Sequence, residues 1–147
     1  MSIETRIKDL LAIEALNVSF GRRLDHGDVA DFVELFTDDV AYSNGPRALN
    51  GREEMLTFFT ARAAQGRVSR HLFSGLDVTF DGPDGADGTS VWLTFAGDGE
   101  LPIRPAEPFL VADVEDRYRR TSDGWRIERR RISPVFRSTT IASPVGR

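Results

Sequence analysis

Two residues of the chain, Asp25 and His71, have side chains that could work together as a proton-transfer pair. Asp25 ends the first amphipathic segment, and His71 lies near the start of an apolar, strand-like segment at residues 69–80. The chain has only two histidines, and histidine is the side chain that gains and loses a proton near neutral pH. A buried histidine beside a carboxylate can act as a general acid or base. The pair therefore points to acid-base chemistry on a small molecule.

Each member of this pair also has a purely structural interpretation. Asp25 could end a helix by bonding to nearby backbone groups, or it could pair with Arg22 or Arg23. His71 could be a structural histidine held by hydrogen bonds at the edge of a strand. The sequence leaves both interpretations open.

The placement of His71 depends on the backbone that follows it. Strict alternation puts His71 and Phe73 on the face opposite the apolar positions of residues 76–80. A β-bulge near Ser74 and Gly75 would bring both sets onto one face, and glycine tolerates such a bulge. We therefore expect a bulge there if His71 faces the interior.

A run of arginines near the carboxyl end offers a cation for the same pocket. Arg129 and Arg131 share a strand face with Trp125 and Ile127, so one of them could hold a carboxylate or enolate oxygen of a substrate. A bulge would exchange this pair for Arg130. The structural alternative is a set of solvated arginines paired with acidic residues of the neighbouring strand.

Several aromatic residues could line a pocket for a flat, apolar ligand, although aromatic residues at strand positions usually belong to an ordinary core. The candidates are Phe20, Tyr42, Phe73, Trp92, Phe95 and Tyr118. Two histidines without any cysteine leave few combinations of transition-metal ligands. The chain also lacks a glycine-rich phosphate loop and a serine nucleophile elbow. We expect no metal and no cofactor.

The bulk composition limits the classes of function. A chain of 147 residues with 40% hydrophobic and 29% charged residues is that of one soluble globular domain, which we place at residues 1–137, with a tail at residues 138–147. The net charge of -4 disfavours nucleic acid as a partner. No apolar run approaches the length of a membrane span, and no signal peptide is evident. We expect a cytoplasmic protein.

The apolar pattern predicts helices first and strands later. Three helices are predicted at residues 3–27, at residues 28–36 and from Asn50 through Phe59, with a strand at residues 40–43 between them. Alternating apolar residues then predict four strands, around residues 76–80, 91–95, 109–120 and 125–136. This order indicates an α+β fold with the helices packed on one face of a curved, mixed or antiparallel sheet.

The ordered set of motifs resembles the SnoaL-like branch of the nuclear-transport-factor-2-like superfamily, whose relatives include scytalone dehydratase, bile acid 7α-dehydratase, polyketide cyclases and ketosteroid isomerase. The resemblance spans nearly the whole chain. The motifs that carry it are Ile13-x-x-Leu16-x-x-x-Phe20-x-x-x-x-Asp25-x-Gly27-Asp28, Leu35-Phe36-Thr37-Asp38-Asp39, Gly51-Arg52, Arg70-His71-Leu72 and Asp123-Gly124-Trp125-Arg126-Ile127.

This resemblance implies a cone-shaped α+β barrel with a deep apolar pocket, assembled as a dimer or trimer. The dehydratases of the superfamily imply a pocket Tyr, Asp and His that act without a cofactor. The Asp falls on Asp25 and the His on His71, but the Tyr position holds Phe20. That difference removes a hydroxyl donor, and Tyr42 and Tyr118 are the two phenols that could replace it.

The sequence thus favours a cofactor-independent dehydratase, isomerase or cyclase that acts on a small hydrophobic cyclic metabolite. His71 would abstract the proton, and Asp25 would orient the histidine. Two alternatives remain open. The first is a noncatalytic binding or assembly module with the same fold, and the second is a small β-type subunit of a larger oxygenase.

Overall fold

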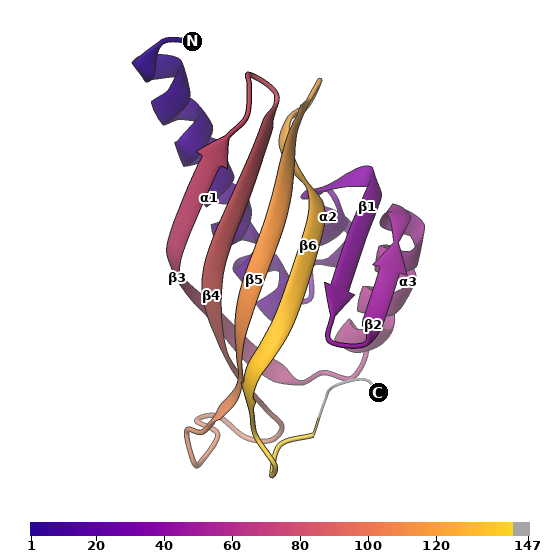
Figure 1. The fold of residues 1–147 in the computed structure, drawn as a ribbon. Helices are drawn as coiled ribbons and strands as arrows, with labels where there is room; N and C mark the ends of the chain where they lie inside the picture. Colours follow the sequence, from indigo (N-terminus) through magenta and orange to yellow (C-terminus); the bar gives the residue numbers. More distant parts are fainter. Residues whose placement is uncertain (143–147) are drawn as a thin grey trace.

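The first helix of the computed structural model, α1 (Ile3–Asp25), carries the first residue of the candidate pair at its carboxyl end. The structure describes residues 1–142. The Ser2 hydroxyl caps α1 by accepting a hydrogen bond from the Thr5 amide. Only the second half of the predicted apolar stripe is buried, because the first half of α1 extends beyond the edge of the sheet (Figure 1). The buried members are Ile13, Leu16, Phe20 and Leu24, and the exposed members are Ile3, Ile7 and Leu10.

A short helix, α2 (Val29–Val33), leads into strands β1 (Phe36–Asn44) and β2 (Arg47–Asn50), followed by helix α3 (Gly51–Ala63). The prediction that the second helix continues to Phe36 is wrong. The Leu35 carbonyl accepts a hydrogen bond from the Ile127 amide at 2.9 Å, so the chain here pairs with a strand instead of closing another helical turn. The third helix lies where the sequence predicts it.

The second half of the chain forms the four predicted strands, each longer than its apolar pattern: β3 (Val68–Phe80), β4 (Gly85–Gly97), β5 (Pro108–Thr121) and β6 (Gly124–Arg137). The sheet order is β2-β1-β6-β5-β4-β3. Every neighbouring pair is antiparallel except β1 with β6, which is parallel. All three helices cover one face of the curved sheet (Figure 1). The α+β prediction is confirmed, but β2 and β3 are open edges, so the sheet does not close into a barrel.

Two β-bulges decide which side chains face the helices. In β3, the pairing with β4 shifts between Ser74 and Asp77, and Gly75 within this stretch has φ 66°. The predicted bulge is thereby confirmed, and His71 and Phe73 share a face with the partly buried positions of residues 76–80. In β6, Tyr118 pairs with Ile127 but the preceding β5 residue pairs with Arg129, which leaves one extra residue in β6.

The segment after β6 returns to the body of the protein over its described part. The Ser138 amide donates to the Phe109 carbonyl, and Ile141 packs against the core. The remainder of the predicted tail, residues 143–147, lies outside the described residues. Over residues 1–142, none of the helices has the length and apolar character that crossing a membrane would require.

Candidate functional site

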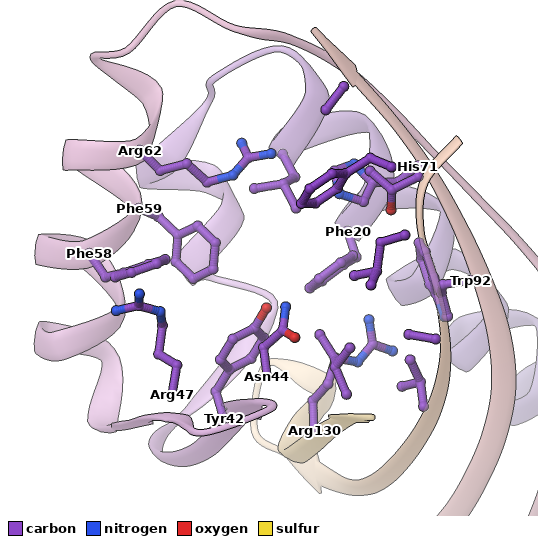
Figure 2. Close-up of a pocket in the computed structure, with 18 of the residues that line it drawn as sticks. Phe20, Tyr42, Asn44, Arg47, Phe58, Phe59, Arg62, His71, Trp92 and Arg130 are labelled. Atoms are coloured by element: carbon purple, nitrogen blue, oxygen red, sulfur yellow. The ribbon is translucent and has the colours of Figure 1, made fainter. Parts of the chain in front are cut away.

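A cavity of about 170 Å³ lies between the helices and the concave face of the sheet. Figure 2 shows its labelled side chains converging from α1, α3 and several strands. Aromatic rings make up much of its wall, among them Phe20, Phe59 and Trp92. Its polar lining comes from Tyr42, Asn44, Arg47, Arg62, His71, Thr94, Arg130 and Arg137. The cavity is therefore largely apolar with a few converging polar groups, which is typical of a small-molecule site.

Asp25 and His71 form the predicted pair at one end of this cavity. His71 Nδ1 lies 2.5 Å from Asp25 Oδ1, and the His71 amide donates to Asp25 Oδ2 at 3.0 Å. The Ser69 hydroxyl donates to Asp25 Oδ1 at 2.9 Å. Asp25 thus holds His71 through Nδ1. The His71 ring lines the cavity. Its other nitrogen, Nε2, makes no hydrogen bond within residues 1–142.

The close packing of α1 on β3 brings this pair together. A Cβ atom on Gly21 would lie only 3.2 Å from the His71 carbonyl oxygen, so glycine lets the helix approach the strand closely at this point. Asp25 follows Gly21 by four residues and therefore lies one helical turn further along the same face. The short contact at Gly21 accounts for the reach of the Asp25 carboxylate to His71.

The environment of Asp25 favours its charged form. Burial acts to raise the pKa of this carboxyl, but the hydrogen bonds and charge of His71, with the Ser69 hydroxyl, outweigh burial and hold the pKa below its usual value. Asp25 is thus set to remain a carboxylate at neutral pH. A carboxylate that accepts from His71 Nδ1 fixes the tautomer in which Nε2 can take a proton from a ligand.

This lowered pKa predicts how the pair affects stability. A depressed folded-state pKa stabilises the protein above the unfolded value of about 4 and loses that effect as pH falls through the folded-state value. We expect Asp25→Asn to be less stable than the wild type at pH 6, with the difference shrinking below about pH 4. Urea unfolding between pH 2.5 and pH 7 measures it. The same change at the exposed Asp77 of β3 is the control, and a pH-independent difference for Asp25→Asn would contradict the prediction.

The two tyrosines lie in different places. Tyr42 is buried in the cavity wall with its hydroxyl directed into the cavity (Figure 2). Burial raises its pKa to about 12, so the phenol stays protonated and can donate a hydrogen bond to a ligand oxygen. Tyr118 does not line the cavity. Its hydroxyl accepts from Asn17 and donates to Asp116 within the core.

Of the three consecutive arginines in β6, Arg130 reaches the cavity, whereas Arg129 and Arg131 are exposed. Strict alternation predicts Arg129 and Arg131 on the inner face, with Arg130 as the alternative if a bulge intervenes, and the extra residue in β6 reverses the alternation after Ile127. Arg130 is fully buried and donates to both oxygens of Asp116, at 2.8 and 2.7 Å.

One buried nitrogen of Arg130 has no hydrogen-bond partner in the described part of the chain. Its Nη2 donates to Asn17 at 2.5 Å as well as to Asp116, but its buried Nη1 has no hydrogen-bond partner within residues 1–142. The guanidinium carbon lies 4.4 Å from the ring centre of Phe20 and 5.3 Å from that of Trp92. The cation is thus fixed beneath the aromatic wall of the cavity.

Some of the aromatic residues that are predicted to bind a ligand line the cavity, and others do not. Phe20, Tyr42 and Trp92 line the cavity. Phe95 lies on the other face of β4, because Trp92 and Thr94 take the inward positions of that strand. Phe73 faces the helices and stacks on Trp92, with ring centres 4.9 Å apart, but does not line the cavity.

Arg62 is one of several cavity residues that the sequence does not single out. Arg62 extends from α3 into the cavity (Figure 2). Helical spacing predicts that Arg62 faces the interior, because it follows the buried Met55 and Phe59 by seven and three residues. A charged residue on the apolar face of a helix was the missed signal. Over residues 1–142, no cluster of three or more His, Cys, Asp or Glu side chains could hold a metal ion.

Comparison with known proteins shows the same fold. Residues 5–131 match the family described as the SnoaL-like domain. A provisionally assigned scytalone dehydratase from Novosphingobium aromaticivorans is 21% identical, with a TM-score of 0.83 over 99% of each chain. A variant of a Mycobacterium tuberculosis protein of unknown function is 22% identical, with a TM-score of 0.82 over 92% of this chain and 76% of that one.

A third solved structure, a provisionally assigned dehydratase of the NTF2-like family from Streptomyces avermitilis, is 22% identical, with a TM-score of 0.75 over 89% of this chain and 99% of that one. No curated protein has a matching sequence. At these identities the likeness to solved structures establishes the fold.

Proposed function

Because the chain belongs to the SnoaL-like domain family, we propose that it is a cofactor-independent acid-base enzyme acting on a small, hydrophobic cyclic metabolite. The observation that carries the proposal is the Asp25 and His71 pair, whose second ring nitrogen, Nε2, has no hydrogen-bond partner among the described residues and belongs to a side chain that lines an apolar cavity. A histidine base held in position by a carboxylate is the arrangement expected of general acid-base catalysis.

In the proposed reaction, His71 Nε2 takes a proton from the carbon next to a substrate carbonyl. Asp25 stabilises the resulting imidazolium through Nδ1, and the Tyr42 hydroxyl donates to the carbonyl oxygen as negative charge develops there. The proton can return to another carbon, which gives an isomer. It can alternatively leave with a hydroxyl group of the substrate as water, which gives a dehydrated product.

Carbon-proton exchange provides a test that does not depend on the natural substrate. The bicyclic ketone 2-tetralone has exchangeable protons next to its carbonyl, and in D₂O their replacement by deuterium can be followed by NMR. We expect the protein to accelerate this exchange above the buffer rate in a saturable manner. Exchange at the buffer rate, despite measurable binding of the ketone, would contradict the proposed function.

The role of Tyr42 gives a quantitative prediction. Removal of one hydrogen-bond donor to a developing oxyanion typically lowers the rate by about 10²–10³-fold, and we expect this loss for Tyr42→Phe. The matched control is Tyr118→Phe, which changes the other tyrosine of the chain, in the core outside the cavity. Its exchange rate per folded molecule should equal that of the wild type. Equal losses in both variants would exclude a specific role for the Tyr42 hydroxyl.

A binding module without catalysis is the second candidate function. Phe20 favours it, because this residue occupies the position where the dehydratase pattern has a tyrosine, and its ring packs 5.2 Å from that of Trp92 in the cavity wall. This candidate predicts tight binding of cyclic ligands with no acceleration of exchange. The experiment on 2-tetralone therefore separates the two functions.

A further inference from the structure

The charged side chains that line the cavity are all cationic. Four arginines contribute, Arg47, Arg62, Arg130 and Arg137, and no Asp or Glu of the described residues lines the cavity. The whole chain nevertheless carries a net charge of -4. This concentration of cations in a largely apolar cavity indicates a ligand with negative charge.

Three of these arginines have surroundings that already account for their charge. Arg130 is paired with the Asp116 carboxylate. Arg47 lies over the ring of Phe58, with its guanidinium carbon 4.5 Å from the ring centre. Arg137 is exposed to solvent near the end of β6. None of these surroundings accounts for the charge of the fourth arginine, Arg62.

Arg62 differs from them in being half-buried while its side chain makes no ion pair or hydrogen bond to any other described residue. Burial lowers its pKa, and the nearby Tyr42 and Asp25 offset this effect only in part. Asp25 is itself occupied by His71 and Ser69. A partly buried charge without an ion partner is less well solvated than the same charge in water, so a bound anion would relieve this cost.

We propose that Arg62 makes the cavity selective for cyclic molecules that carry a carboxylate, which its guanidinium binds inside the aromatic wall. The planar guanidinium matches a carboxylate with two parallel hydrogen bonds. The wall formed by Phe20, Phe59 and Trp92 receives the ring. As a statement about the substrate class, the inference rests on the proposed function, whereas the binding preference is measurable without turnover.

The test compares 2-naphthoate with 2-naphthamide, which have the same ring system and differ in the charge of the substituent. Calorimetry should give at least tenfold tighter binding of the naphthoate to the wild type. In Arg62→Gln this preference should disappear through a loss of naphthoate affinity, with naphthamide affinity unchanged. The control is Arg22→Gln, which removes the same charge from an exposed position on α1 outside the cavity and should keep the preference.

Two results would overturn the inference. One is equal binding of the two ligands by the wild type, and the other is an undiminished preference in Arg62→Gln. The wild-type comparison needs no variant, so it stands even if the substitution affects folding. Carboxylate preference without exchange of 2-tetralone protons would remove the proposed catalysis and leave the anion site intact. Exchange without carboxylate preference would do the reverse.

Discussion

Replacement of His71 by asparagine is expected to slow carbon-proton exchange by roughly 10²–10⁴-fold, the usual contribution of a positioned acid or base. Asparagine can donate to Asp25 from a position near that of Nδ1, but it has no group that takes a proton near neutral pH. The hydrogen bond of 2.5 Å between His71 and Asp25 therefore has a partial substitute, while Nε2 is lost. Exchange of 2-tetralone protons measures the rate, and calorimetry measures binding of the ketone.

The second histidine of the chain provides a matched control. His26 is exposed at the carboxyl end of α1 and does not line the cavity. We expect His26→Asn to exchange protons at the wild-type rate. A wild-type rate in His71→Asn, with ligand binding intact, would show that the cavity has another base. Equal losses in both histidine variants would point to a general effect on the fold.

Replacement of Asp116 by alanine is expected to lower the free energy of unfolding by about 3–5 kcal/mol. This is the typical cost of removing one partner of a buried ion pair and leaving the other charge unpaired. Arg130 is fully buried, and Asp116 accepts two of its hydrogen bonds. Burial acts to lower the pKa of Arg130, and Asp116 holds it well above its usual value, so removal of the carboxylate leaves a buried guanidinium without its charge partner. Asp116 also accepts from the Tyr118 hydroxyl, which would lose its acceptor as well.

Chemical denaturation of Asp116→Ala and Asp113→Ala compares two positions on β5. Asp113 is exposed and has no ion pair or hydrogen bond from its side chain to any other described residue. Its replacement should change the free energy of unfolding by no more than about 0.5 kcal/mol. Replacing Asp116 by leucine together with Arg130 by methionine should recover part of the loss, because no charge is then left buried. Similar losses for Asp116→Ala and Asp113→Ala would contradict the importance of the buried pair.

The sequence predicted the elements that carry the proton-transfer pair because their signals are local. The apolar spacing of α1 and its end before Gly27 place Asp25, and the glycine at position 75 marks the bulge that turns His71 inward. The approach of these two segments follows from packing at Gly21, which no local pattern reveals. The pairing itself came from the resemblance to a family and from the chemistry of the two side chains.

The inward arginine was harder to predict because the bulge in β6 has no glycine to mark it. Strict alternation from Trp125 and Ile127 selects Arg129 and Arg131, and one extra residue moves the inner position to Arg130. The parallel pairing of β1 with β6 likewise depends on tertiary packing, and it converts residues assigned to the second helix into a strand. The helical spacing of α3 does predict that Arg62 faces the interior. A charged residue on the apolar face of a helix was not recognised as part of the site.

The extra residue in β6 also bears on how the site could change during evolution. Arginine occupies three consecutive positions, 129, 130 and 131, so the side chain that enters the core is chosen by the backbone and not by residue identity. Loss of the bulge with every residue retained would turn Arg129 and Arg131 inward in place of Arg130, whereas deletion of the extra residue, Glu128, would restore strict alternation and keep Arg130 facing Asp116. Alignments of distant relatives therefore need gaps inside this strand, where insertions are ordinarily penalised, if equivalent buried cations are to be matched.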